Sequence, residues 1–231
     1  MLGVRGRPQE DMRKGQTVGD ALAATWFDIA EPDPAYEVTD DPSGVFNQGF
    51  GRGAAIFNRL EGCWYDDGSV FFVSTSGGDA ENGDVNDDGY REGFGQVWEY
   101  RPGRHGGDGL LTLWFESPSG DVLDSPDNLT VTPRGGLMLC EDDASVAITD
   151  SHPQAPGIEN VNRLIGLTPA GDAFEFAVNR LSDSELAGVC FSPDGQTVFF
   201  NIFGASEGTP AEHADEGMTL AVTGPWAEGP L

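Results

Sequence analysis

The fold is indicated most clearly by a short pattern that first appears as GCWYDDGSVFFV at residues 62–73. The pattern recurs as LTVTPRGGLMLC at residues 129–140 and as VCFSPDGQTVFF at residues 189–200. Each copy is a β-rich run, a turn that contains glycine and a second β-rich run, which is the signature of a β-hairpin. The copies lie roughly 60 to 65 residues apart, so we interpret them as structural repeats.

Further β-rich runs follow each hairpin and extend each repeat toward a four-stranded unit. No segment of helical length shows the 3.6-residue period of an amphipathic helix. Radially repeated four-stranded sheets are the blades of a β-propeller. The runs are QVWEY at residues 96–100, LTLWF at 111–115, RLIGL at 163–167, AFEF at 173–176 and TLAV at 219–222.

We therefore expect an all-β fold with about three four-stranded blades of the β-propeller type, plus an N-terminal strand near residues 25–29. Closed propellers have about four to eight blades, so the expected fold is a partial propeller. The early strand could belong to a blade that begins outside the chain. An open half-ring exposes sheet edges, so the chain is either part of a larger protein that supplies an N-terminal half or a chain that associates through those edges.

The expected organisation has two parts. Residues 1–20 form a flexible N-terminal segment, and residues 21–231 form the partial propeller domain. The first 20 residues carry basic side chains but no apolar core, so they do not make an intact secretory signal. No stretch of the chain approaches the ~20 apolar residues of a membrane span.

Charge is the dominant global feature, with 39 acidic against 12 basic residues and a net charge of −27. Nucleic-acid phosphate and anionic lipid would be repelled by such a surface, so neither nucleic acid nor a membrane is expected as a partner. Two interpretations of the acidity are compatible. One is a solvated surface that favours solubility, and the other is a set of carboxylates that converge on cations.

The three cysteines, Cys63, Cys140 and Cys190, are widely spaced and contain no C-x-x-C pair. They predict no disulfide framework. Each lies within or beside an apolar run, where a buried free thiol is expected.

Acidic residues recur near the first strand of each hairpin unit, at Glu61, Asp127 and Glu185. In a propeller the innermost strands line a central channel, so equivalent positions converge near one axis. Carboxylates gathered in this way repel each other unless a cation joins them, and carboxylate oxygen is a preferred ligand of calcium. The alternative is that these are ordinary turn acids.

A second candidate calcium site is the loop DVNDDGY at residues 84–90, which matches the D-x-[DN]-x-[DN]-G opening of a calcium loop. The match is incomplete, because the twelfth position is Gly95 rather than a bidentate Glu. An acidic solvated loop is the alternative. The candidate ligands are Asp84, Asn86, Asp88, the carbonyl of Tyr90, and Glu92.

Arg59 and Glu61 form an Arg-x-Glu pair that places a cation and a carboxylate on one side of a strand. The planar guanidinium of arginine binds phosphate through two parallel hydrogen bonds, and Glu61 could hold a metal beside it. An ordinary ion pair is the alternative.

Several motifs in order give the chain a family resemblance that extends from about Trp26 onward. They are FNRLEG at residues 57–62, FVSTSGG at 72–78, GQVWEY at 95–100, PDNL at 126–129, LCED at 139–142, GLTP at 166–169 and TGPW at 223–226. In this order the chain resembles the PhoX family of calcium-dependent alkaline phosphatases, specifically the C-terminal half of such a protein.

The resemblance implies a six-bladed propeller with calcium and iron in its channel and hydrolysis of phosphate monoesters through metal-bound oxygen. It implies phosphate binding by Arg59 and metal ligation by Glu61. The repeat adds Asp127, Glu141 and Glu185 as further expected metal ligands. A periplasmic or secreted location is also implied. The N-terminal half of the family, with an iron-ligating cysteine, has no counterpart here, so the iron ligands are partly absent and this chain alone is expected to hold an incomplete metal cluster.

Two alternatives to a phosphatase remain open at the level of the sequence. The motifs PDN at residues 126–128 and SPDG at 192–195 also suit a calcium-dependent propeller of the lactonase type. Exposed sheet edges also suit a non-catalytic binding module that calcium stabilises.

Overall fold

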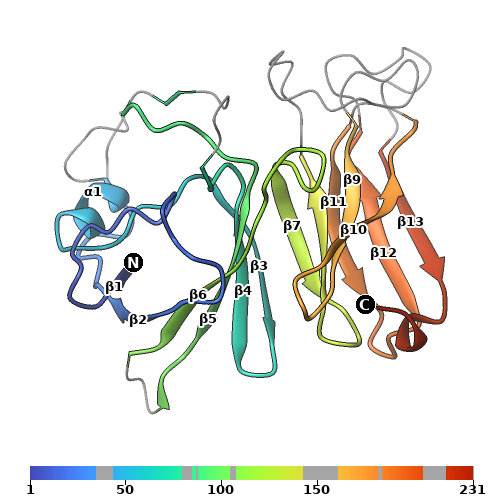
Figure 1. The fold of residues 1–231 in the computed structure, drawn as a ribbon, viewed down its shortest axis with the longest axis horizontal. Helices are drawn as coiled ribbons and strands as arrows, with labels where there is room; N and C mark the ends of the chain where they lie inside the picture. Colours follow the sequence, from blue (N-terminus) through green and yellow to red (C-terminus); the bar gives the residue numbers. More distant parts are fainter. Residues whose placement is uncertain are drawn as a thin grey trace.

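The structure is a computed structural model in which three antiparallel sheets stand side by side (Figure 1). The described residues are 1–34, 44–79, 85–86, 88–104, 108–142, 161–181, 184–204 and 217–230. Strands dominate these residues. They also contain the short helix α1 (Val45–Phe50), which was not expected from the sequence, and the 3-10 turn η2 (Trp226–Glu228).

The first sheet has six strands in the order β1-β2-β6-β5-β4-β3, the second has four in the order β10-β9-β8-β7, and the third has three in the order β11-β12-β13. The strands of the first sheet are β1 (Leu2–Val4), β2 (Ala21–Trp26), β3 (Leu60–Asp66), β4 (Ser69–Ser74), β5 (Gln96–Arg101) and β6 (Leu110–Glu116). Those of the second are β7 (Pro126–Val131), β8 (Leu137–Glu141), β9 (Arg163–Leu167) and β10 (Ala173–Val178). Those of the third are β11 (Leu186–Phe191), β12 (Thr197–Ile202) and β13 (Met218–Thr223).

The three expected hairpins are confirmed as β3–β4, β7–β8 and β11–β12. In the first hairpin Asp66 pairs with Ser69, and the two turn residues Asp67 and Gly68 have φ values of 41° and 84°. Positive φ at both central positions is the requirement of a type I′ turn, whose twist matches that of the flanking strands. The local sequence therefore fixes the hairpin.

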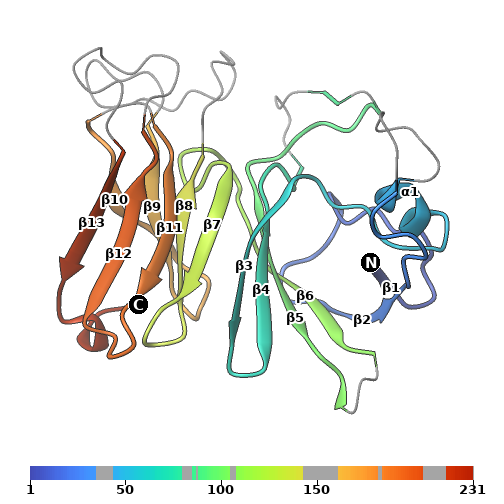
Figure 2. The same ribbon diagram turned by 180° about the vertical axis from the view of Figure 1, so that it is seen from behind.

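The first strand of each hairpin lies at the edge of its sheet, and these three edge strands are neighbours. β3 lies beside β7, and β7 lies beside β11. The arrows of β3, β7 and β11 point the same way in both views (Figures 1 and 2). Because they are the innermost strands of successive blades, the partial propeller expected from the sequence is confirmed.

Apolar side chains fill the spaces between the sheets. One cluster, which includes Val73, Leu129 and Leu139, lies between the first and second sheets. Another, which includes Met138, Leu164 and Phe200, lies between the second and third sheets. This packing holds the blades at fixed relative positions, as burial of facing apolar surfaces does in stacked sheets.

The N-terminal segment is packed against the first sheet. β1 pairs with β2, β2 pairs with the outer strand β6, and Met12 is fully buried beneath the sheet. The expectation that the early strand belongs to a blade beginning outside the chain is wrong, because β2 extends the first sheet. The division of the chain at residue 20 stays a prediction. No helix among the described residues is long and apolar enough to cross a membrane.

Candidate functional site

The carboxylates predicted from the repeat lie at one end of the inner strands. The first ladder pairs of the three hairpins are Leu60 with Ser74, Pro126 with Glu141 and Leu186 with Ile202. A register shift follows the first pair in the first two hairpins and the second pair, Ala187 with Asn201, in the third. Glu61 and Asp127 therefore occupy the same position in their blades. Glu185 comes two positions earlier, directly before β11.

The charges of these carboxylates act on one another, which shows that the side chains are close together. Burial raises the pKa of Asp127 to about 6, and repulsion from Glu61 and Asp142 adds to the rise. Burial also raises the pKa of Glu185 to about 7, with further contributions from the charge and hydrogen bond of Asp142 and from the charges of Asp127 and Glu61. The structure thus brings Glu61, Asp127 and Glu185 together, and their role as metal ligands stays a prediction.

Asp142 belongs to the same group, although the sequence did not single it out. Its carboxyl interacts with Glu185 and repels Asp127. Its main-chain N–H donates to the carbonyl of Ser125 at 3.0 Å, which fixes the end of β8 beside the start of β7. The signal was present in the LCED motif, where Asp142 follows Glu141 directly.

Arg59 stands directly before β3 with a φ of 49°. Ser125, the residue directly before β7, has a φ of 47°, so the two blades share a left-handed residue at this point. Such conformations cost about 1–3 kcal/mol for a residue other than glycine and concentrate at functional sites. The Nη1 of Arg59 donates to Ser76 Oγ at 3.4 Å, and the Arg59 charge opposes part of the rise in the pKa of Asp127.

The alternative of an ordinary Arg59–Glu61 ion pair is not supported. Among the salt bridges of the described residues, none joins Arg59 to Glu61, and none includes Asp127 or Glu185. Arg59 precedes the strand in a left-handed conformation, so the alternation of a regular strand does not position it. Its guanidinium lies near Asp127 without neutralising the acidic group through a direct contact.

Glu141, also predicted as a ligand, has a different environment. Its side chain is fully buried, and its two oxygens accept hydrogen bonds from Arg163 Nη2 at 2.6 Å and Arg163 Nε at 2.7 Å. The main-chain N–H groups of Asp124 and Arg163 donate to the same carboxylate at 2.8 and 2.9 Å. Burial raises the pKa of Glu141, and the donors from Arg163 oppose the rise. Because four protein donors bind its oxygens, we do not include the Glu141 carboxylate in the candidate metal site.

In the loop predicted as a calcium site, candidate ligands that the structure describes also make hydrogen bonds to other protein groups. Arg13 Nη1 donates to Asp88 Oδ2 at 2.6 Å, and this guanidinium holds the pKa of Asp88 below its usual value. The Tyr90 carbonyl accepts from the Asn86 N–H at 2.8 Å. Glu92 accepts from the Asn58 side chain at 3.0 Å. Asp84 lies outside the described residues.

Arg13 and the Tyr90 side chain fix the described end of this loop. The guanidinium carbon of Arg13 lies 4.3 Å from the centre of the Tyr90 ring, and the buried Tyr90 hydroxyl donates to the Gly78 carbonyl at 2.6 Å. Arg13 also contacts Asp11 at 2.9 Å. The sequence did not reveal this network, because Arg13 belongs to the segment that was expected to be flexible.

Main-chain contact between the inner strands sets their separation. A Cβ added at Gly62 would meet the carbonyl oxygen of Asp127 and lie 2.8 Å from the Cα of Asn128. On the other side of β7, the Asn128 Oδ1 accepts from the Gly188 N–H at 2.7 Å. The three inner strands are thus held close together at the end where the carboxylates lie.

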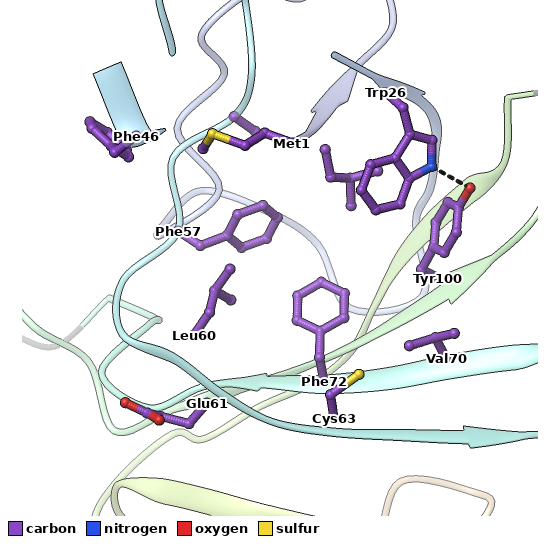
Figure 3. A pocket seen from close by; sticks show the side chains of 12 residues that line it. Met1, Trp26, Phe46, Phe57, Leu60, Glu61, Cys63, Val70, Phe72 and Tyr100 are labelled. Carbon is purple, nitrogen blue, oxygen red and sulfur yellow. Dashed lines mark hydrogen bonds between the residues drawn. The ribbon is translucent and has the colours of Figure 1, made fainter. Parts of the chain in front are cut away.

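An apolar pocket of about 430 Å³ lies next to Glu61, which is one of its lining residues (Figure 3). Its walls come from the N-terminal strands, the region of α1 and the face of the first sheet turned away from the second sheet. Cys63, which was expected to be buried, is exposed and lines this pocket, while Cys140 is buried and Cys190 is partly buried. The lining residues are Met1, Leu2, Trp26, Phe46, Ala55, Phe57, Leu60, Glu61, Cys63, Val70, Phe72 and Tyr100.

As arranged in the structure, no three His, Cys, Asp or Glu side chains among the described residues form a group that could hold a metal ion on their own. The acidic group at the inner strands is therefore a partial donor set. It offers several carboxylates to a shared region rather than a closed coordination sphere.

Comparison with known proteins defines the class to which this fold and site belong. A family model for the alkaline phosphatase PhoX matches residues 7–205. Since the match covers most of the chain, the chain belongs to the PhoX alkaline phosphatase family. No curated protein matches the chain.

Among solved structures, the chain is similar to Pseudomonas fluorescens PhoX in complex with vanadate, a transition-state analogue. The TM-score is 0.60 at 20% sequence identity, and the match covers 88% of this chain and 41% of the Pseudomonas chain. The chain thus spans about two fifths of the length of this relative. The likeness supports the propeller-type fold.

Proposed function

We propose that this chain supplies the phosphate-binding arginine and part of the calcium-binding carboxylate set of a PhoX-type phosphomonoesterase. The observation that carries the proposal is the convergence of Glu61, Asp127 and Glu185 at one end of the inner strands, with Arg59 beside them. Membership of the PhoX family supports the same chemistry and favours a phosphatase over a lactonase. The resemblance also extends to a periplasmic or secreted location.

The carboxylates fit a hard divalent cation. Mutual repulsion contributes to the raised pKa values of Asp127 and Glu185, so a bound cation would remove an unfavourable interaction. Carboxylate oxygens suit calcium, which accepts six to eight oxygen ligands in flexible geometry. Iron would need donors beyond this set, as the resemblance to the C-terminal half of the family also implies. When bound, calcium would supply the positive charge that polarises a phosphoryl oxygen.

The roles of the side chains follow from their chemistry. Arg59 would bind the nonbridging oxygens of the phosphate through its planar guanidinium and orient the ester. Glu61 and Asp127, at equivalent positions in adjacent blades, would hold the cation next to this phosphate. Glu185 and Asp142 would share a proton or a cation between them, since both carboxyls face the same region and interact directly.

Hydrolysis of p-nitrophenyl phosphate and of a sugar lactone, each with calcium and with chelator, tests the proposal. We expect calcium-dependent hydrolysis of the phosphate ester when the N-terminal half of the propeller is supplied, because this chain provides only part of the proposed metal-binding set. Glu61→Gln should lower kcat/KM by about 100-fold or more, because metal ions contribute several kcal/mol of transition-state stabilisation. Asp66→Asn is the matched control, since Asp66 is an exposed carboxylate at the other end of the same strand.

The outcomes separate the three candidate functions. Hydrolysis of the lactone alone would show a lactonase. With the N-terminal half present, hydrolysis of neither substrate, with calcium still raising the melting temperature, would show a binding module. Equal activity of the Glu61→Gln and Asp66→Asn proteins would remove Glu61 from the site.

A further inference from the structure

The apolar pocket beside Glu61 has the size and lining of a small-molecule site. Its volume of about 430 Å³ falls within the range of roughly 300–1,000 Å³ that is usual for ligand pockets. Five of its lining residues are aromatic: Trp26, Phe46, Phe57, Phe72 and Tyr100. Figure 3 shows these rings arranged around one space.

The polar atoms of the wall are largely satisfied without a ligand. Trp26 Nε1 donates to the Tyr100 hydroxyl at 2.7 Å, and the two rings meet edge to face with centroids 5.4 Å apart. Phe57 meets Phe72 in a similar geometry at 5.6 Å. Glu61 is the one charged side chain among the twelve lining residues. The interior therefore recognises apolar and aromatic surface rather than hydrogen-bonding groups.

Glu61 connects this pocket to the candidate active site. It lines the pocket, and its charge acts on Asp127 and Glu185. In Figure 3 Leu60 points into the pocket, while the Glu61 carboxylate lies at its edge. A molecule whose charged end is held beside Glu61 would therefore have its uncharged end at the mouth of an aromatic cavity.

We propose that this pocket receives the organic group of the substrate, so that the chain favours phosphate monoesters of aromatic or other apolar alcohols. This inference rests on the proposed phosphatase function. The strongly negative charge of the chain disfavours a second anionic group on that alcohol, and the aromatic walls favour a flat apolar body. Small polar monoesters would bind through the phosphate alone.

The test uses the chain together with the N-terminal half of the propeller, loaded with calcium, and compares 1-naphthyl phosphate with methyl phosphate. Cys63→Trp fills the pocket from an exposed position on β3, where an aromatic residue suits the strand. Tyr65→Trp is the control, because Tyr65 is exposed on the same strand and does not line the pocket. Binding of the neutral fluorophore N-phenyl-1-naphthylamine gives a readout that is independent of catalysis.

We expect kcat/KM to be higher for the naphthyl ester by about tenfold or more, as apolar contacts in a fitted pocket provide. Cys63→Trp should abolish this preference and the binding of the fluorophore, while Tyr65→Trp should keep both. Equal kcat/KM values for the two esters, unaffected by Cys63→Trp, would overturn the inference and leave the phosphatase intact. Fluorophore binding that Cys63→Trp blocks, in a protein that hydrolyses no monoester, would instead overturn the proposed function. Fluorophore binding that depends on protein concentration and disappears in a dimer would assign the pocket to a second copy of the chain and overturn the inference.

Discussion

The Glu141 carboxylate and the carboxylates of the inner strands lie only one strand apart, but their burial and hydrogen bonding differ. Glu141, at the end of β8, is fully buried and receives four hydrogen bonds, two of them from Arg163 side-chain nitrogens. Asp127 and Glu185, at the starts of the inner strands, are partly exposed and repel their acidic neighbours. Carboxylates thus form a stabilising ion pair at Glu141, while those at Asp127 and Glu185 are part of no salt bridge among the described residues.

The difference follows from the position of each residue in its blade. Glu141 pairs with Pro126 across the β7–β8 ladder, and β9 supplies the arginine from the other side of β8. The inner strands have a neighbouring strand on only one side within their own sheet. A carboxylate there faces the corresponding end of the next blade, which is also acidic. An arginine partner makes the Glu141 carboxylate structural. Asp127 accepts a hydrogen bond from the neutral Asn128 side chain at 2.6 Å, and none of the salt bridges among the described residues includes it, so its charge is not neutralised by an arginine.

The largest expected effect comes from breaking the structural pair. Arg163→Ala would leave the buried Glu141 carboxylate without its charged donors, and such uncompensated buried charges cost about 3–5 kcal/mol of unfolding free energy. Arg101→Ala, which removes an exposed partner of Glu99, should cost about 1 kcal/mol or less. Urea unfolding of both variants checks the difference. Equal losses would mean that the Glu141 pair is no more important than a surface pair.

The next effect separates stability from phosphate binding at Arg59. Arg59→Gly removes the guanidinium but relieves a left-handed backbone, so unfolding free energy should stay the same or rise. Loss of a charge-assisted contact to phosphate should weaken inhibition by inorganic phosphate about 10- to 100-fold. Phosphate inhibition and urea unfolding are measured on the same preparation. Weaker folding with unchanged phosphate affinity would contradict the role of Arg59.

A smaller effect tests the repulsion among the inner-strand carboxylates. In the folded chain the pKa of Asp127 is raised from 3.8 to about 6. Its ionisation therefore costs stability that is present below about pH 4 and is lost as the pH rises through about 6. In chelator, Asp127→Asn should gain stability relative to the parent over this range, by about 1 kcal/mol or less for a group that solvent partly screens.

The effect of calcium on stability can be compared between the same two proteins, the parent and Asp127→Asn. Added calcium should stabilise the parent at neutral pH and should stabilise Asp127→Asn less, because the ion binds the carboxylate. Thermal melts at several pH values, with calcium and with chelator, measure both effects. A parent and variant with parallel pH profiles and equal responses to calcium would place Asp127 outside the site.

The smallest expected effect concerns the loop around Asp88. Because Asp88 pairs with Arg13, Asp88→Ala should leave calcium affinity unchanged in a calorimetric titration. The pair should contribute about 1 kcal/mol or less to stability, because its Asp88 carboxylate is exposed although Arg13 is buried. A clear loss of calcium binding in this variant would restore the loop as a metal site and weaken the contrast between carboxylates with and without an arginine partner.

The sequence was sufficient to predict the hairpins, because the strand patterns and the turn residues are local. It also predicted the convergence of Glu61 and Asp127, because both acids recur near the first strand of their hairpin units. The structure gives them the same position, one residue after the first ladder pair. The offset of Glu185 depends on the register of β11 with β12, which sequence spacing does not fix.

Long-range partners account for the rest of what the sequence missed. Glu141 is 22 residues from Arg163, and Asp88 is 75 residues from Arg13. Neither arginine lies in a sequence motif that indicates its acidic partner. The exposure of Cys63 likewise depends on how the N-terminal strands pack over the first sheet, because they leave a pocket beside a thiol that was expected to be buried.

The close approach at Gly62 would have a consequence for ion selectivity at the proposed cation site. Because peptide groups of β3 and β7 touch there, the gap between neighbouring blades is fixed by rigid backbone rather than by adjustable side chains. An ion of larger radius could be accommodated only by rotating the acidic side chains themselves. A single methyl group at this glycine would widen the gap and alter which cations fit, without changing any ligand.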